Sequence, residues 1–153
     1  MNIDLQYSTV GEAPEQAALV RNAIDREPDG LAVTLAYPDA VGPAVQAAAD
    51  AGIPAVAFNA GIDLSEQYGA QMYFGSDERL AGESVGKRLA ESGAGKSICV
   101  IQEQGVVSLE TRCEGVQASF PNTELLYVEG TDLPSVRRRS ARNCSRTRRS
   151  RTS

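Results

Sequence analysis

Residues 29–63 read DGLAVTLAYPDAVGPAVQAAADAGIPAVAFNAGID, and the spacing of apolar runs within them sets the expected architecture. Two runs, Leu31–Ala36 and Ile53–Phe58, have the length and composition of strands that are covered on both faces. Between them, Asp39 is a candidate helix cap and Gly52 a helix end. A strand, a helix and a second strand in this short span predict a βαβ unit with parallel strands.

The alternation of strands and helices extends on both sides of this unit. An alternating segment, Ile3–Tyr7, predicts a short strand, and a helix with apolar positions from Ala13 to Ile24 follows it. Further strands are expected at Gln71–Gly75, Ser97–Ile101 and Glu124–Glu129. This order predicts the α/β class with a parallel sheet.

Two more helices are expected between the later strands. The first has candidate caps at Ser76 and Asp77 and ends at Gly93. The second has a candidate cap at Ser108 and ends before Pro121. Their expected inward faces are Leu80, Ala81, Val85 and Leu89 in the first, and Leu109, Cys113, Val116 and Phe120 in the second.

The charge of the chain is divided unevenly along its length. The 153 residues contain 15 Lys and Arg against 20 Asp and Glu, for a net charge of −5. Eight of those bases are arginines within residues 137–153 and no acid lies beyond Asp132, so residues 1–136 have a net charge of −13 and the tail +8. An acidic body argues against nucleic-acid binding by the folded part.

Several classes of function are disfavoured by what the sequence lacks. There is no histidine, so neither a Ser-His-Asp triad nor a histidine metal site is expected, and we expect no cofactor and no enzyme activity. The N-terminus shows no signal-peptide pattern, and no apolar run is long enough to span a membrane. The cysteines, Cys99, Cys113 and Cys144, are expected to be buried free thiols, with a Cys99–Cys113 disulfide as the alternative in an exported protein.

Two motifs resemble known catalytic or phosphate-binding patterns. Residues 82–86, GESVG, match the G-x-S-x-G nucleophile pattern but fall inside an expected helix rather than at a strand-to-helix turn. Residues 93–97, GAGKS, resemble the end of a P-loop but precede a strand, whereas a P-loop follows one. We therefore interpret the first as a helix segment and the second as a helix-ending turn.

Candidate ligand-binding residues follow the predicted strands, because ligands of open α/β sheets bind at the carboxyl ends of the strands. They are an aromatic ring, an amide, a carboxylate and a guanidinium: Tyr37, Asn59, Asp77 and Arg112. Such a set suits a neutral polyol, whose adjacent hydroxyls take polar partners and whose C–H faces take a ring. The alternative is that Asn59 and Asp77 only cap turns and that Arg112 is a solvated helix residue.

Three segments together resemble the ribose-binding-type periplasmic proteins, which are sugar-binding components of ABC transporters and share their fold with the sensor domains of LacI-type repressors. They are residues 29–63, residues 73–94 (YFGSDERLAGESVGKRLAESGA) and residues 98–120 (ICVIQEQGVVSLETRCEGVQASF). The resemblance implies two α/β lobes with sugar bound between them. It also implies sugar contacts from Tyr37, Asn59 and Arg112, with Asp77 at the first hinge crossing.

This resemblance implies a partial, two-lobed fold. We expect part of the first lobe at 1–75 and part of the second at 76–136. The family's first strand is central, so its absence should leave unpaired strand edges in the first lobe. Residues 137–153 are expected to be disordered or a reading-frame artefact, which the coding DNA would decide.

The function implied is that of an ABC-transporter substrate-binding protein, periplasmic in the parent family, which delivers a monosaccharide or polyol to a membrane permease. The main alternative is the ligand-sensing domain of a LacI-type transcriptional regulator, and a weaker one is nucleic-acid binding by the arginine-rich tail. Because about half of the cleft is expected to be missing, we expect little sugar affinity for these 153 residues alone.

Overall fold

A computed structural model describes residues 2–8, 12–128, 134, 137–138 and 141 of the chain. The chain divides into two compact units, residues 1–77 and residues 78–153. Of the predicted arginine-rich tail only Arg137, Arg138 and Ala141 are described, so the expectations for the tail and for Cys144 lie outside the described residues.

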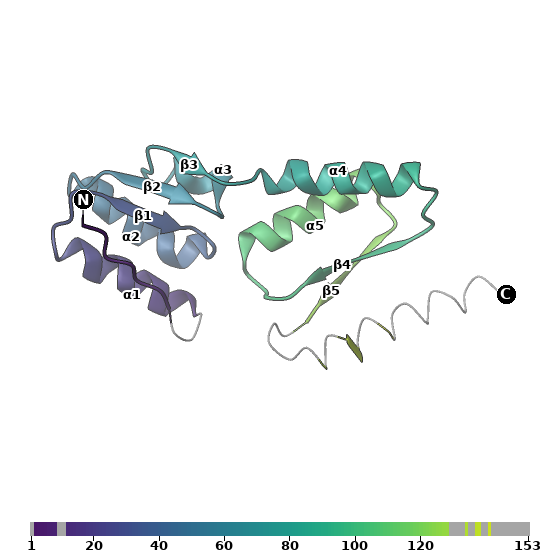
Figure 1. The fold of residues 1–153 in the computed structure, drawn as a ribbon, viewed down its shortest axis with the longest axis horizontal. Coiled ribbons are helices and arrows are strands. Elements are labelled where there is room, and N and C mark those ends of the chain that lie inside the picture. Colours follow the sequence, from purple (N-terminus) through teal and green to yellow (C-terminus); the bar gives the residue numbers. More distant parts are fainter. Residues whose placement is uncertain (1, 9–11, 129–133, 135–136, 139–140, 142–153) are drawn as a thin grey trace. The chain divides into compact units, whose positions relative to one another are not determined.

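The first unit contains a parallel three-stranded sheet (Figure 1). Its strands are β1 (Leu31–Thr34), β2 (Ala55–Phe58) and β3 (Tyr73–Phe74), in the order β1-β2-β3. Leu31 pairs with Ala55 and Ala57 with Tyr73. The predicted parallel βαβ unit is confirmed, although both of its strands are two residues shorter than expected.

The helices in the described part of this unit are α1 (Ala13–Ile24), α2 (Pro38–Asp50) and the short α3 (Ile62–Ser65). The predicted cap at Asp39 is wrong, because α2 begins at Pro38 and the cap position is occupied by Tyr37, two residues before Asp39. Proline suits this first helical position, since its fixed φ is already helical and an N–H there would have no helical partner.

The core of the first unit lies between the sheet and the helices. Its members are small or branched apolar side chains, of which Leu35 and Val45 are fully buried. The buried cluster comprises Val20, Val33, Leu35, Val41, Ala44, Val45, Ala55, Ala57 and Ala70.

The predicted strand at Ile3–Tyr7 is wrong. No strand is assigned within residues 2–8, and the side chains of Ile3, Leu5 and Tyr7 are at least 73% exposed. A strand needs a neighbour that pairs its backbone groups, and this segment pairs with none of the described strands. Within that sheet β2 lies between β1 and β3.

Residues 78–128 of the second unit contain α4 (Glu78–Glu91), β4 (Ser97–Ile101), α5 (Val107–Ser119) and β5 (Thr123–Tyr127). The two strands are parallel, with Ser97 opposite Thr123. The predicted cap at Ser108 is wrong, because Val106 occupies the cap position and Ser108 lies inside α5. The GAGKS segment begins with the turn that ends α4, where the N–H of Gly93 donates to the carbonyl of Ala90, as interpreted from the sequence.

The inward face predicted for α4 is wrong. Leu80 and Val85 are 58% and 48% exposed, whereas Glu78, Gly82 and Gly86 are buried. A Cβ at Gly82 would stand 2.0 Å from the carbonyl oxygen of Arg112 on α5. The backbones of α4 and α5 are in contact at this glycine. Only a residue without a Cβ permits such a close approach. Gly82 and Gly86 of the GESVG segment therefore belong to the packing surface of α4, and the segment lies inside a helix as interpreted.

Candidate functional site

Three of the four predicted ligand-binding residues belong to the first unit and follow neighbouring strands. Tyr37 follows β1, Asn59 directly follows β2, and Asp77 lies three residues beyond β3. Because these strands are parallel neighbours, their carboxyl ends share one edge of the sheet. The structure therefore brings Tyr37, Asn59 and Asp77 to the same edge, where ligands of such sheets bind.

Backbone hydrogen bonds tie these strand ends together. The N–H of Leu35 donates to the carbonyl of Ala60 at 3.3 Å, joining the segments that follow β1 and β2. The N–H of Asn59 donates to the carbonyl of Phe74 at 2.9 Å, joining the end of β2 to β3. The three strand ends at this edge are thus held together by the sheet itself.

Asn59 is exposed and has a left-handed backbone conformation, with a φ of 66°. Asparagine tolerates this region better than other residues with a Cβ, because its short polar side chain can hydrogen-bond locally. The next residues turn sharply: Ala60 is buried, and Gly61 has a φ of 89° and packs against Leu35. The chain turns from β2 into α3 here, and the exposed position of Asn59 leaves its side chain accessible to solvent.

Tyr37 and Asp77 differ in their exposure. Tyr37 is half-buried and packs against the core cluster of the first unit, while its carbonyl accepts hydrogen bonds from the N–H groups of Ala40 and Val41. Asp77 is exposed and is the last residue of the first unit. Part of the Tyr37 ring therefore contributes to the core, so its available face is smaller than that of a fully exposed tyrosine.

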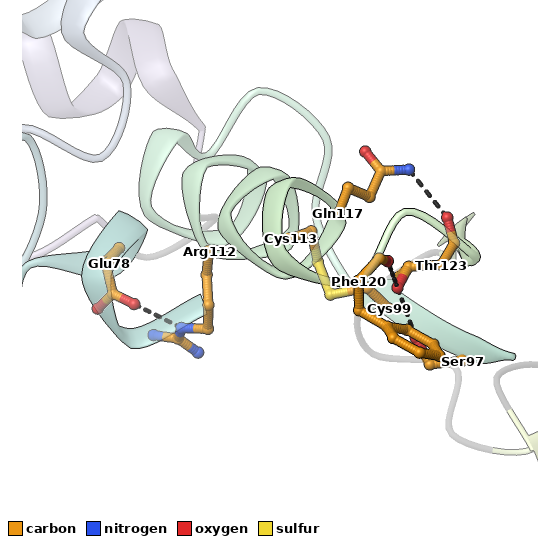
Figure 2. Close-up of a disulfide and its surroundings, with 8 residues drawn as sticks. All are labelled: Glu78, Ser97, Cys99, Arg112, Cys113, Gln117, Phe120 and Thr123. Carbon is orange, nitrogen blue, oxygen red and sulfur yellow. Dashed lines mark hydrogen bonds and ion pairs between the residues drawn. A yellow bond between two sulfur atoms is a disulfide. The ribbon is translucent and has the colours of Figure 1, made fainter. Parts of the chain in front are cut away.

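Arg112, the fourth predicted residue, lies on α5 in the second unit and pairs with Glu78 at the start of α4. Its Nε donates to Oε2 of Glu78 at 2.5 Å (Figure 2). The Glu78 side chain is 12% exposed and that of Arg112 is 48% exposed. The hydrogen bond to Glu78 raises the pKa of Arg112 above its ordinary value, against a smaller lowering by burial. The guanidinium is therefore cationic throughout the neutral range.

The disulfide between Cys99 on β4 and Cys113 on α5 lies next to this arginine in the chain (Figure 2). The expectation of free thiols is wrong for these two residues, and the alternative pairing is the one observed. Their Cα atoms are 5.7 Å apart and Cys113 is 3% exposed. The bond fixes the position of α5 against β4 at the residue directly after Arg112.

Polar contacts fasten the other end of α5. The hydroxyl of the buried Thr123 donates to the carbonyl of Phe120 at 2.7 Å and lies 2.6 Å from the hydroxyl of Ser97 (Figure 2). The amide of Gln117 donates to the carbonyl of Thr123 at 2.9 Å. The helix that holds Arg112 is thus anchored to both strands of the second unit.

Glu78 is the residue of this region that sequence reasoning missed. An acidic residue in the first turn of a helix is ordinarily explained by the helix dipole, and nothing in the sequence links it to a residue 34 positions away. Within the described residues no group of three or more metal-ligating side chains gathers, and no described helix is long and apolar enough to cross a bilayer.

Known proteins resemble this chain in sequence and in fold. The model of the periplasmic binding protein domain matches residues 1–144. A crystal structure of a carbohydrate transporter from Acidothermus cellulolyticus 11B, in complex with myo-inositol, is 47% identical, with a TM-score of 0.83 over 86% of this chain. A solute-binding protein of an ABC transporter from Agrobacterium vitis, with bound D-fucose, is 26% identical, with a TM-score of 0.64 over 80% of this chain.

A periplasmic sugar-binding protein from Legionella pneumophila is 22% identical, with a TM-score of 0.80 over 90% of this chain, and supports the fold alone. A comparison with curated proteins found no match. The chain spans about half the length of the solved proteins, covering 46% of the Acidothermus protein, 43% of the Agrobacterium protein and 52% of the Legionella protein.

The expected class, α/β with parallel strands, is confirmed, and the structure corresponds to part of the two-lobed fold of these proteins. The family model matches nearly the whole chain, and the solved proteins that resemble it are sugar-binding proteins of ABC transporters. The chain belongs to the periplasmic binding protein domain family.

Proposed function

We propose that this chain is part of the substrate-binding component of a sugar ABC transporter and that its ligand is a cyclic polyol or a monosaccharide. The observation that supports this most strongly is the 47% identity, over 86% of the chain, to a carbohydrate transporter in complex with myo-inositol. In this proposal the two units are parts of the two lobes, and ligand binding shifts the population toward a closed state that a membrane permease recognises.

The residue chemistry of the candidate site supports a neutral hydroxylated ligand. The carboxamide of Asn59 both donates and accepts, the carboxylate of Asp77 accepts, and the guanidinium of Arg112 donates in a planar fork. Adjacent ring hydroxyls present donors and acceptors at the spacing these groups match. The accessible part of the Tyr37 ring would cover C–H groups of the sugar ring, as aromatic side chains do in ligand sites.

The Cys99–Cys113 disulfide supports an exported location. Structural disulfides form and persist in oxidising compartments such as the periplasm and are rare in the cytosol. We therefore infer that the chain works outside the cytoplasm, in keeping with the family to which it belongs. We propose no catalytic role for any of its residues.

A ligand panel tests the proposed class of substrate. Ligand-observed NMR with saturation transfer would compare myo-inositol, D-fucose and D-arabinose with leucine and inorganic phosphate. We expect transfer to myo-inositol or a monosaccharide, with affinity no tighter than the millimolar range, and none to leucine or phosphate. Transfer to leucine or phosphate alone would contradict the proposal, and micromolar binding of a sugar would contradict the expected weakness of the isolated chain.

A further inference from the structure

Three separate contacts fix the position of Arg112, which is more than an exposed helix residue requires. The backbone of Arg112 lies against Gly82, where a Cβ would stand 2.0 Å from its carbonyl oxygen. The next residue, Cys113, is bonded to Cys99. The side chain is held by Glu78 through Nε. Preorganisation of this kind is what a ligand-binding side chain needs.

The geometry of the ion pair leaves part of the guanidinium available. The carboxylate of Glu78 accepts a hydrogen bond from Nε of Arg112. Within the described part of the chain, Nη1 and Nη2 of Arg112 donate none. The side chain is 48% exposed. The two terminal nitrogens, which are the pair that matches adjacent oxygens bidentately, are accessible while the third nitrogen is anchored.

Glu78 is well suited to anchor the arginine. Its side chain is 12% exposed, and it lies in the first turn of α4, where the helix dipole stabilises a carboxylate. A second ion pair between the same helices, Arg79 with Glu114 at 2.8 Å, is exposed on both sides, at 49% and 55%. The second pair can tie α4 to α5 as well as the first does, so linking the helices does not by itself explain a shielded carboxylate at Glu78.

From this difference we propose that Glu78 is a positioning residue: it holds Nε of Arg112 so that Nη1 and Nη2 face a hydroxylated ligand. This rests on the proposed function, in which Arg112 contacts the sugar. Glu78 itself touches no ligand in this account. Its effect reaches the ligand only through the orientation of the guanidinium.

The test compares Glu78→Ala and Glu78→Gln with the control Glu114→Ala, which removes the exposed ion pair between the same two helices. The readouts are the Arg112 Nε–H signal in NMR, its rate of exchange with water, and the Kd for myo-inositol. In Glu78→Ala we expect faster exchange at Nε and a Kd raised about tenfold, because a charge-assisted hydrogen bond is lost. In Glu78→Gln we expect a rise of about threefold, since an acceptor remains.

The control and a double-mutant cycle distinguish two roles of Glu78: positioning the guanidinium of Arg112, and only linking α4 to α5. Glu114→Ala should leave both the Nε signal and the Kd unchanged. In an Arg112→Met background, Glu78→Ala should have no further effect on the Kd, because methionine has no N–H for Glu78 to hold. If the effects of Glu78→Ala and of the substitution at Arg112 on the Kd are additive, Glu78 only links the helices. The same holds if Glu78→Ala and Glu114→Ala raise the Kd equally.

The outcomes also separate this inference from the proposed function. If the wild-type chain responds to myo-inositol and the cycle is additive, the positioning role is wrong and the proposed function stands. If the wild-type chain shows no response to any sugar while Nε remains protected, the proposed function fails, and the role of Glu78 toward a ligand fails with it.

Discussion

Gly82 on α4 faces the carbonyl oxygen of Arg112 on α5 so closely that a Cβ at position 82 would stand 2.0 Å from that oxygen. Gly115 makes the reciprocal approach, since a Cβ there would stand 2.4 Å from the carbonyl oxygen of Arg79. Backbone atoms cannot yield as the far end of a flexible side chain can. The spacing of α4 and α5 therefore depends on glycine in both helices.

Gly82→Ala is expected to destabilise the second unit by about 2 to 3 kcal/mol, because overpacking against backbone forces the helices apart. Urea denaturation, with NMR signals from each unit as separate probes, measures the change. Ser84→Ala on the exposed face of the same helix is the matched control and should change stability by less than about 0.5 kcal/mol. A Gly82→Ala chain as stable as the control would mean that the helices do not pack in this way.

The Cys99–Cys113 disulfide is expected to stabilise the second unit only. It closes a loop with a sequence separation of 14, for which the loss of chain entropy in the unfolded state corresponds to about 3 kcal/mol. In a Cys144→Ser background, dithiothreitol should lower the denaturation midpoint of the second unit and leave that of the first unchanged. The same reagent should have no effect when Cys99 and Cys113 are also serine. A drop in the midpoint of the first unit would contradict this assignment.

Substitutions at Asn59 separate its role in the turn from its proposed role in binding. Asn59→Gly relieves the left-handed backbone and should leave the stability of the first unit unchanged or slightly higher. Asn59→Ala should lower it by about 1 kcal/mol, because alanine disfavours a positive φ. Both variants remove the carboxamide and should weaken sugar binding alike. If Asn59→Gly binds sugar as the wild type does, the role of Asn59 is limited to forming the turn.

Periodicity predicted most elements of this fold because each has a strong local signal. The βαβ unit follows from two apolar runs with a helix between them, and β4 matches its predicted bounds, Ser97–Ile101. The predicted strand at Ile3–Tyr7 is wrong because alternation describes a single segment, whereas a strand depends on a neighbour. The predicted inward face of α4 is wrong because hydrophobicity favours Leu80 and Val85, whereas glycine is what permits the closest contact with α5.

The candidate site could be predicted only in part. Strand ends locate Tyr37, Asn59 and Asp77, because parallel strands bring their carboxyl ends to one edge of a sheet. The partner of Arg112 could not be predicted, because the pair joins two helices that are distant in sequence and depends on how they pack. The disulfide was one of two alternatives, since spacing alone does not decide whether two cysteines meet.

Protein-observed NMR during a titration with myo-inositol tests the sugar-binding account most directly. We expect saturable shifts, with a millimolar Kd, that are confined to residues 35–37, 59–61 and 75–77 at the carboxyl edge of the first sheet and to the side chain of Arg112. Saturable shifts centred elsewhere, for example on α1, or no saturable shift with any sugar, would contradict it.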